Sequence, residues 1–274
     1  MVKASLVGSV LGNVLLVLGG AMAVGGWRRE RQTFNRTAVQ AYAGMLLLAV
    51  AVLLLPSLMQ LARGRSLPSV GAGRVDFPSD LDALTVGIAA VLLLSYAGGM
   101  LFSLRTHRRF FNPPAEREHA NTGTSTWVSV ARLAVAGVLV GVTSEIMVGE
   151  IARTAEIVGI SEFFIGVVVV AIVGNAAEDW VAVLAGYRDQ MHLAIAIALG
   201  SSAQIALVVA PLLALLSFAL PTPLPLVFNA YEIGALIAAV LIANYVTGEG
   251  ESTWFEGVQL LALYAALGVL FFLA

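Results

Sequence analysis

Residues 165–186 read IGVVVVAIVGNAAEDWVAVLAG, an apolar stretch of membrane-spanning length that contains two adjacent carboxylates. About 20 apolar residues in a helix cross the hydrocarbon core of a bilayer. A carboxylate inside such a span costs at least about 2.5–3.5 kcal/mol on insertion scales, so Glu178 and Asp179 need a partner or a task. This stretch therefore predicts a transmembrane helix that carries a polar site.

The rest of the chain has the composition of an integral membrane protein. It is 59% hydrophobic and 12% charged, against about 45–50% and about 25% in soluble proteins. Apolar runs predict about eight transmembrane helices and an all-α, polytopic fold. The predicted spans are 4–26, 38–61, 81–104, 127–149, 162–186, 192–220, 226–246 and 254–274.

Charge and composition exclude several classes of function. Seventeen acids stand against fifteen Lys and Arg residues with no basic stripe, which excludes nucleic acid as a partner. The absence of Cys excludes disulfides and thiolate metal sites. No HExxH-like pair or His cluster occurs, so we expect a transporter and not an intramembrane metalloenzyme.

The distribution of basic residues predicts the orientation of the chain. Loops on one side collect ten Lys and Arg residues and loops on the other side collect five. By the positive-inside rule, the 27–37 and 105–126 loops face the cytoplasm and both chain ends lie outside. The short loops favour a cell (inner) membrane.

Asn175 and Glu178 lie three residues apart and therefore share one face of the helix. Gly174 is expected to let the backbone open and release carbonyl oxygens. Carboxylate, amide and carbonyl oxygens suit Ca²⁺, Na⁺ or Mn²⁺, whereas Zn²⁺ would need His or Cys. The alternative is a polar patch for helix packing, with the small residues 174–177 allowing close contact.

The next span contains a second polar cluster, Gly200-Ser201-Ser202-Ala203-Gln204. Ser201 and Gln204 also share a helix face. The alternative interpretation is a kinked helix whose side chains satisfy loosened backbone ahead of Pro211. Because only a short connection separates it from the Glu178 helix, the cluster is expected to form the facing half of a site.

An internal repeat relates the first span to the sixth. Residues 2–20 (VKASLVGSVLGNVLLVLGG) shifted by 192 place Gly8-Ser9 on Gly200-Ser201, and each pair is followed by an amide, Asn13 or Gln204. Secondary transporters build midplane sites from such repeats. The counterpart of Glu178 falls at 178 − 192 = −14, so we expect the N-terminal helices and the first part of the first repeat to be lacking.

These segments resemble the calcium/proton exchangers of the calcium/cation antiporter superfamily over nearly the whole chain. The resemblance rests on 159–179 (GISEFFIGVVVVAIVGNAAED), on 189–211 (DQMHLAIAIALGSSAQIALVVAP) and on the closing helices, with Gly200 following Glu178 by 22 residues. It implies an eleven-helix, inverted-repeat antiporter fold of which this chain holds a part.

The resemblance also implies the division of the chain. Residues 1–104 would be the remainder of the first helix group, with three spans and the second part of the first repeat. Residues 105–126 would be a cytosolic linker, and 127–274 would be the second helix group, with five spans and the complete second repeat.

Residue roles follow from the same resemblance. Glu178 would bind calcium, with Asn175, Ser201 and Gln204 completing its half-site. Ser9 and Asn13 would belong to the first-repeat half, and Glu145 resembles an acid of the cytosolic vestibule. Asp179 stands where the family usually has His, and with Glu145 and Glu178 it is a candidate for proton coupling.

The expected function is secondary active exchange of Ca²⁺ for H⁺ through midplane carboxylates, with no cofactor. The expected partners are Ca²⁺ and H⁺ as substrates and the lipid bilayer, and a homo-oligomer is left open. The alternatives are sodium/calcium exchange, or a truncated, non-transporting chain that needs a partner half.

Overall fold

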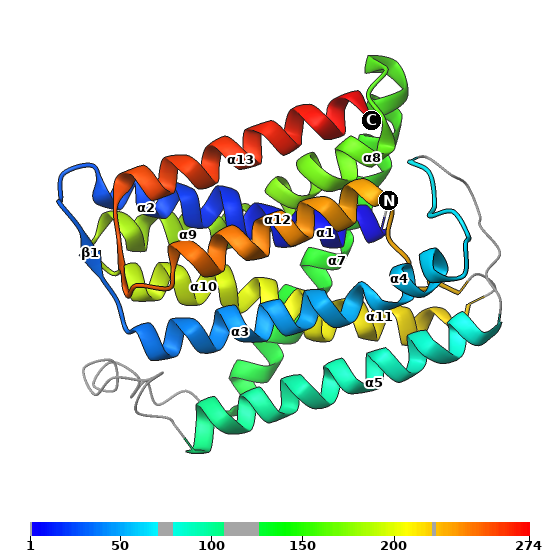
Figure 1. Ribbon diagram of the computed structural model, residues 1–274, viewed down its shortest axis with the longest axis horizontal. Helices are drawn as coiled ribbons and strands as arrows, with labels where there is room; N and C mark the ends of the chain where they lie inside the picture. Colours follow the sequence, from blue (N-terminus) through cyan, green and yellow to red (C-terminus); the bar gives the residue numbers. More distant parts are fainter. Residues whose placement is uncertain (1, 71–78, 107–125, 221–222) are drawn as a thin grey trace.

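The structure, a computed structural model, describes residues 2–70, 79–106, 126–220 and 223–274. Figure 1 shows a bundle in which most of the long helices run along one direction, while α7 (Thr126–Val158) crosses them at a steep angle. Both chain ends lie at one end of the bundle and β1 (Gln32–Thr33) lies at the other.

Helical segments joined end to end form the long rods of the bundle. The first part of the chain contains α1 (Val2–Leu11), the π-helical η1 (Gly12–Val17) and α2 (Leu18–Gly26), then α3 (Arg36–Leu53) and α4 (Leu55–Ala62), then α5 (Ser79–Leu101) and the π-helical η2 (Phe102–Thr106). Pro56 falls in the first turn of α4, where its missing N–H leaves no hydrogen bond unmade.

The second part repeats this construction after α7. It contains α8 (Glu162–Phe164), the π-helical η4 (Ile165–Val170) and α9 (Ala171–Tyr187), then α10 (Met191–Gln204), the π-helical η5 (Ile205–Val209) and α11 (Ala210–Ser217), then α12 (Ala230–Val246), β2 (Glu251–Ser252) and α13 (Trp254–Leu273).

The predicted spans agree with the helices in number and approximate position. Within the described residues, six helical rods are long and apolar enough to cross a membrane, and shorter apolar helices cover 127–143 and 230–246. Two boundaries differ from the predicted spans. The helix α7 continues to Val158, and α12 begins at Ala230, after a non-helical approach.

The π-helical segments support the internal repeat. The shift of 192 residues carries Gly12–Val17 onto 204–209, and η5 occupies Ile205–Val209. π-Helical turns are rare and are frequent at functional sites. The two related spans therefore share a π-helical segment as well as their Gly-Ser pair, although the π-helical segments η2 and η4 occur in two other rods.

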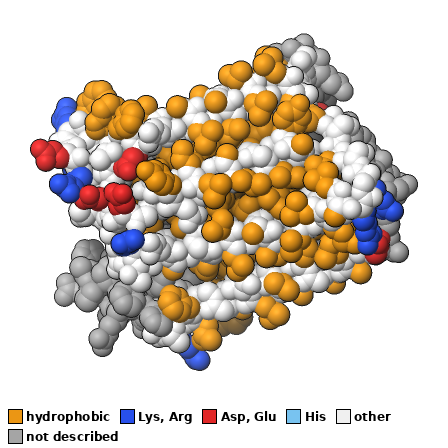
Figure 2. All heavy atoms as spheres, viewed as in Figure 1, with side chains coloured by type: hydrophobic (Ala, Val, Ile, Leu, Met, Phe, Trp, Pro, Cys, Tyr) orange, Lys and Arg blue, Asp and Glu red, His pale blue; other side chains and the backbone are white. Residues whose placement is uncertain are grey.

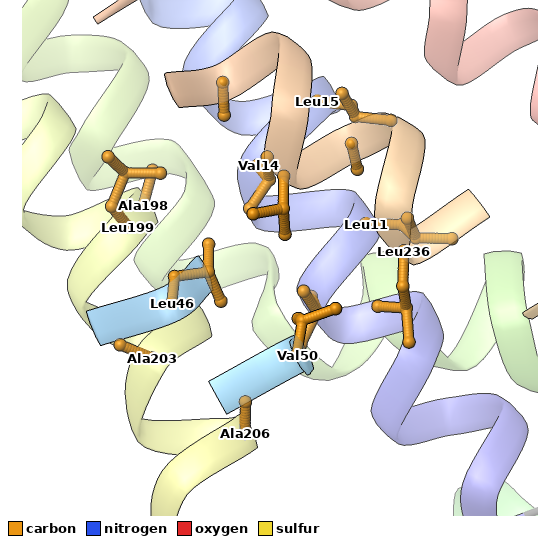
Figure 3. Packing of buried hydrophobic residues seen from close by; sticks show 14 of the residues in the cluster. Leu11, Val14, Leu15, Leu46, Val50, Ala198, Leu199, Ala203, Ala206 and Leu236 are labelled. Atoms are coloured by element: carbon orange, nitrogen blue, oxygen red, sulfur yellow. The ribbon is translucent and has the colours of Figure 1, made fainter. Parts of the chain in front are cut away.

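A large part of the core lies between the first rod, α10 and α12, with α3 packed against α10 and α12. Figure 3 shows Leu11, Val14 and Leu15 of the first rod in one buried cluster with Leu46 and Val50 of α3, Leu236 of α12 and small residues of the α10 rod. The small residues Ala198, Ala203 and Ala206 are almost completely buried. Small residues let helix backbones approach closely in membranes, which is the packing expected here.

Three loops meet at the β1 end of the bundle. β1 pairs antiparallel with β2, Gln32 opposite Ser252. The buried Gln32 side chain donates to the carbonyl of Gly186 at 3.1 Å and to the Asp189 carboxylate at 2.7 Å. These contacts connect the loop after α2, the turn between α9 and α10, and the loop before α13.

Figure 2 shows charged side chains gathered toward the two ends of the bundle, with a broad apolar surface between them. That distribution matches a hydrocarbon layer bounded by two polar interfaces.

Candidate functional site

The helices that bear Glu178 and Ser201 meet at this pair. The Ser201 hydroxyl donates a hydrogen bond to Oε1 of Glu178, so the two predicted polar clusters lie in contact across α9 and α10. The Glu178 side chain is exposed and Ser201 is half-buried. A carboxylate that accepts one hydroxyl and keeps its remaining lone pairs open is able to bind a proton or a cation.

Asn175 lies on α9 one turn before Glu178, as the spacing predicts. Its side chain is half-buried. Gln204 ends α10 one turn after Ser201 and is exposed. Gln204 also lines a cavity of about 210 Å³ between α3, α5 and α10. Residues of this cavity with polar groups include Tyr42, Tyr96, Ser103 and Gln204.

Ser9 and Asn13, the candidates from the first repeat, lie on α1 and η1, which pack against both α9 and α10. Asn13 is only 3% exposed, and its amide nitrogen has no hydrogen-bond partner within the described part of the chain. Buried polar groups are nearly always paired, so this amide nitrogen beside the Glu178 and Ser201 helices is an exception, while a cation would be bound by the amide oxygen of Asn13.

Asp179 lies next to Glu178 and is half-buried. Its Oδ1 has no hydrogen-bond partner among the described residues, and the same holds for the hydroxyl of Tyr264 on α13. The two groups lie within electrostatic range of each other. Asp179 therefore lies near Tyr264 as well as beside Glu178.

The expectation for Gly174 is wrong. Residues 171–187 form a continuous α-helix through Gly174, and the irregular backbone lies earlier, in the π-helical η4. The backbone carbonyls around Gly174 therefore accept α-helical hydrogen bonds and are not released to bind an ion. Any backbone carbonyl oxygens available to bind an ion would have to come from the π-helical segment η4.

Glu145 lies on α7, and its side chain is outside the part of the chain that the structure describes. Most of the 105–126 linker, from 107 to 125, is also outside the described residues. Among the described residues, no three or more His, Asp or Glu side chains gather into a metal-binding group. The described acids at the site are Glu178 and Asp179.

Two further acids in apolar helices have structural tasks that the sequence analysis missed. Glu232 forms a capping box with Asn229 at the start of α12, and Glu256 does the same with Thr253 at α13. The signal was present in the sequence, because Asn229 and Thr253 are each followed three residues later by Glu. These carboxylates satisfy helix N-termini and are not candidates for the ion site.

Comparison with known proteins identifies the family. The sodium/calcium exchanger protein family matches residues 1–105 and 128–273. The chain belongs to this family. It is a multi-pass membrane protein whose fold is all-α and forms part of an inverted-repeat antiporter fold.

Within the exchanger family, similar relatives come from bacteria and fungi. The chain is 39% identical over 277 residues to the Ca²⁺/H⁺ antiporter ChaA of Bacillus subtilis, covering 100% of this chain and 75% of the relative. It is 38% identical over 274 residues to a vacuolar calcium ion transporter of Schizosaccharomyces pombe, covering 99% and 65%.

A solved exchanger structure has the same arrangement of helices. The structure of native YfkE superposes with a TM-score of 0.77 at 36% identity, over 99% of this chain and 74% of that one. The chain thus spans about two thirds to three quarters of the length of these relatives.

Proposed function

We propose that this protein is a secondary active transporter that exchanges Ca²⁺ for H⁺ across a membrane. The observation that carries the proposal is the hydrogen bond from Ser201 to Glu178, because it joins two membrane-spanning helices at a carboxylate that remains open to a substrate. The relative named as a Ca²⁺/H⁺ antiporter in Bacillus subtilis supports the same assignment.

The candidate ligands supply oxygen atoms alone, as a hard cation requires. Glu178 offers a carboxylate, Ser201 a hydroxyl, and Asn175 and Gln204 amide oxygens. Ca²⁺ accepts six to eight such ligands in a flexible geometry. In this proposal the amide oxygen of Asn13 and the hydroxyl of Ser9 add ligands from the first repeat.

Exchange follows from competition at one carboxylate. A protonated Glu178 has lost the charge that attracts Ca²⁺, and a bound Ca²⁺ occupies the lone pairs that would take the proton. The Ser201 hydroxyl rotates to serve either state, because it can donate to a carboxylate or present a lone pair to a cation. Asp179 and Glu145 are proposed to pass protons to and from this site.

Alternating access is proposed to come from movement between the two helix groups, 1–104 and 127–274, joined by the 105–126 linker. The loops at 27–37 and 105–126 would face the cytoplasm and the chain ends would face outside. The reaction needs no cofactor, since the downhill movement of protons supplies its free energy.

The test is ⁴⁵Ca²⁺ uptake into proteoliposomes containing the purified chain, driven by an acid interior. We expect uptake with a proton gradient and none with a sodium gradient alone. Glu178→Gln should reduce uptake to the level of empty liposomes, because the neutral amide lacks the negative charge that attracts Ca²⁺ and cannot bind and release a proton. Glu249→Gln, which changes an exposed loop acid, is the matched control and should transport normally.

Three other results would each contradict one part of the proposal. Uptake driven only by sodium would indicate sodium/calcium exchange. Absence of uptake by a folded, correctly inserted chain would show that transport requires a further polypeptide. Normal uptake by Glu178→Gln would remove Glu178 from the site.

A further inference from the structure

An open groove lies between the end of α2 and the end of α9, away from the Glu178 site. Its lining residues are Ala23, Val24, Trp27, Arg28 and Tyr187, and its volume is about 340 Å³. This is near the lower end of the range for small-ligand pockets. The groove lies at the β1 end of the bundle, where the apolar helix surface meets the charged loops (Figures 1 and 2).

The groove contains one arginine, Arg28, with which no acid of the described residues forms an ion pair. Arg28 is exposed and has no hydrogen bond or ion pair with any described residue. The neighbouring arginines differ, because Arg29 pairs with Asp189 at 3.5 Å and Arg31 pairs with Glu251 at 2.9 Å. Asp189 and Glu251 are thus already engaged, whereas Glu30 in the same loop is exposed and has no ion pair with Arg28, so Arg28 is left to attract an external anion.

Two aromatic side chains give the groove the character of a membrane interface. Trp27 is 74% exposed and Tyr187 is 57% exposed, although both are large. Trp and Tyr concentrate at the level of lipid headgroups, where an apolar ring meets a polar layer. Trp27 also packs edge-on against Trp254 with ring centroids 6.0 Å apart, which limits its movement.

We propose that this groove binds an anionic phospholipid from the leaflet at the β1 end of the bundle. The phosphate pairs with the Arg28 guanidinium, whose fork of N–H donors matches phosphate oxygens. The upper part of an acyl chain lies along Ala23 and Val24, and the rings of Trp27 and Tyr187 flank the glycerol region. This lipid site is separate from ion exchange and does not depend on the proposed transport activity.

Trp27 provides a local probe for the test. Replacing Trp127, Trp180 and Trp254 by Phe leaves Trp27 as the one tryptophan, since the chain has four. The full chain is reconstituted in phosphatidylcholine, and either brominated phosphatidylglycerol or brominated phosphatidylcholine is added at the same mole fraction. Bromine quenches tryptophan fluorescence at short range, so quenching reports the lipid beside Trp27.

We expect the anionic lipid to be preferred about fivefold over phosphatidylcholine, the order of effect for one arginine facing an anionic headgroup. Arg28→Gln should lower this ratio to about one, while Arg28→Lys should keep part of it. Arg36→Gln is the matched control, because Arg36 is also exposed near the β1 end and does not line the groove.

Three results would overturn the proposal. Equal quenching by the two lipids in the unmodified chain would mean ordinary boundary lipid. If Arg36→Gln lost the preference for the anionic lipid to the same extent, the preference would come from the diffuse charge of the surface and not from a site at Arg28. Displacement of the lipid preference by millimolar inorganic phosphate would mean that the groove binds free phosphate and not a lipid.

Discussion

At the residue scale, two adjacent serines on α10 have different tasks. The Ser201 hydroxyl donates to the Glu178 carboxylate, whereas the fully buried Ser202 hydroxyl donates to the carbonyl of Ala198 in its own helix, at 2.9 Å. Successive residues on a helix point about 100° apart, so only one of the two can face α9. The polar pair in the sequence is thus one site residue and one internal hydrogen bond.

This difference predicts a selective effect of removing each hydroxyl. Ser201→Ala should weaken Ca²⁺ binding about tenfold, because it removes a proposed oxygen ligand, and a polar contact to a charged group contributes about 1.5–3 kcal/mol. Ser202→Ala is the matched control and should change the affinity less than about twofold. Isothermal titration with Ca²⁺ measures both, and equal effects of the two variants would contradict the assignment of Ser201.

At the element scale, close contacts at small residues hold α9 against the first rod. A side chain at Gly186 would overlap the backbone of Ala21 on α2, and one at Gly8 would overlap the backbone of Val167 on η4. Contacts at both ends therefore set the position of the α8–η4–α9 rod, which carries Glu178. The site geometry depends on this packing as well as on the ligands themselves.

A methyl group at Gly186 should separate these helices. We expect Gly186→Ala to destabilise the protein by about 1–3 kcal/mol, the usual cost of overpacking a tight contact. Gly44→Ala is the matched control, since nothing lies within 4 Å of a side chain at that helical position. Thermal unfolding in detergent compares the two, and a similar midpoint for both would show that the α2–α9 contact can adjust.

At the scale of the whole molecule, the chain has two polar ends and an apolar middle. The loop after α2 and the turn between α9 and α10 lie at one end, held together by Gln32 and Asp189, and both chain ends lie at the other (Figure 1). The excess of arginine in the loops at the first end predicts that this end faces the cytoplasm.

Cysteine labelling tests this orientation, because the chain contains no cysteine of its own. Thr33→Cys introduces a thiol at the β1 end, and Arg65→Cys introduces one after α4, both at exposed positions. A membrane-impermeant maleimide added to intact cells should label Arg65→Cys and leave Thr33→Cys unlabelled until the cells are opened. The reverse pattern would invert the predicted topology.

The ion-site candidates show how much of the site can be predicted from the spacing of residues in the sequence. The pairs Asn175 with Glu178 and Ser201 with Gln204 were predicted from three-residue spacing, and the helices α9 and α10 place them on that spacing. The spacing does not specify which member of one pair contacts the other pair. That choice, Ser201 to Glu178, depends on the angle and depth at which two helices pack.

The sequence by itself determined the membrane class, the approximate positions of the helices and the polar faces, because hydrophobic length and helical periodicity are local properties. Only the tertiary structure revealed the contact between Ser201 and Glu178, the unpaired amide nitrogen of Asn13 and the contact between Gln32 and Asp189. Those features depend on which residues distant in the chain are brought together, and packing between helices decides that.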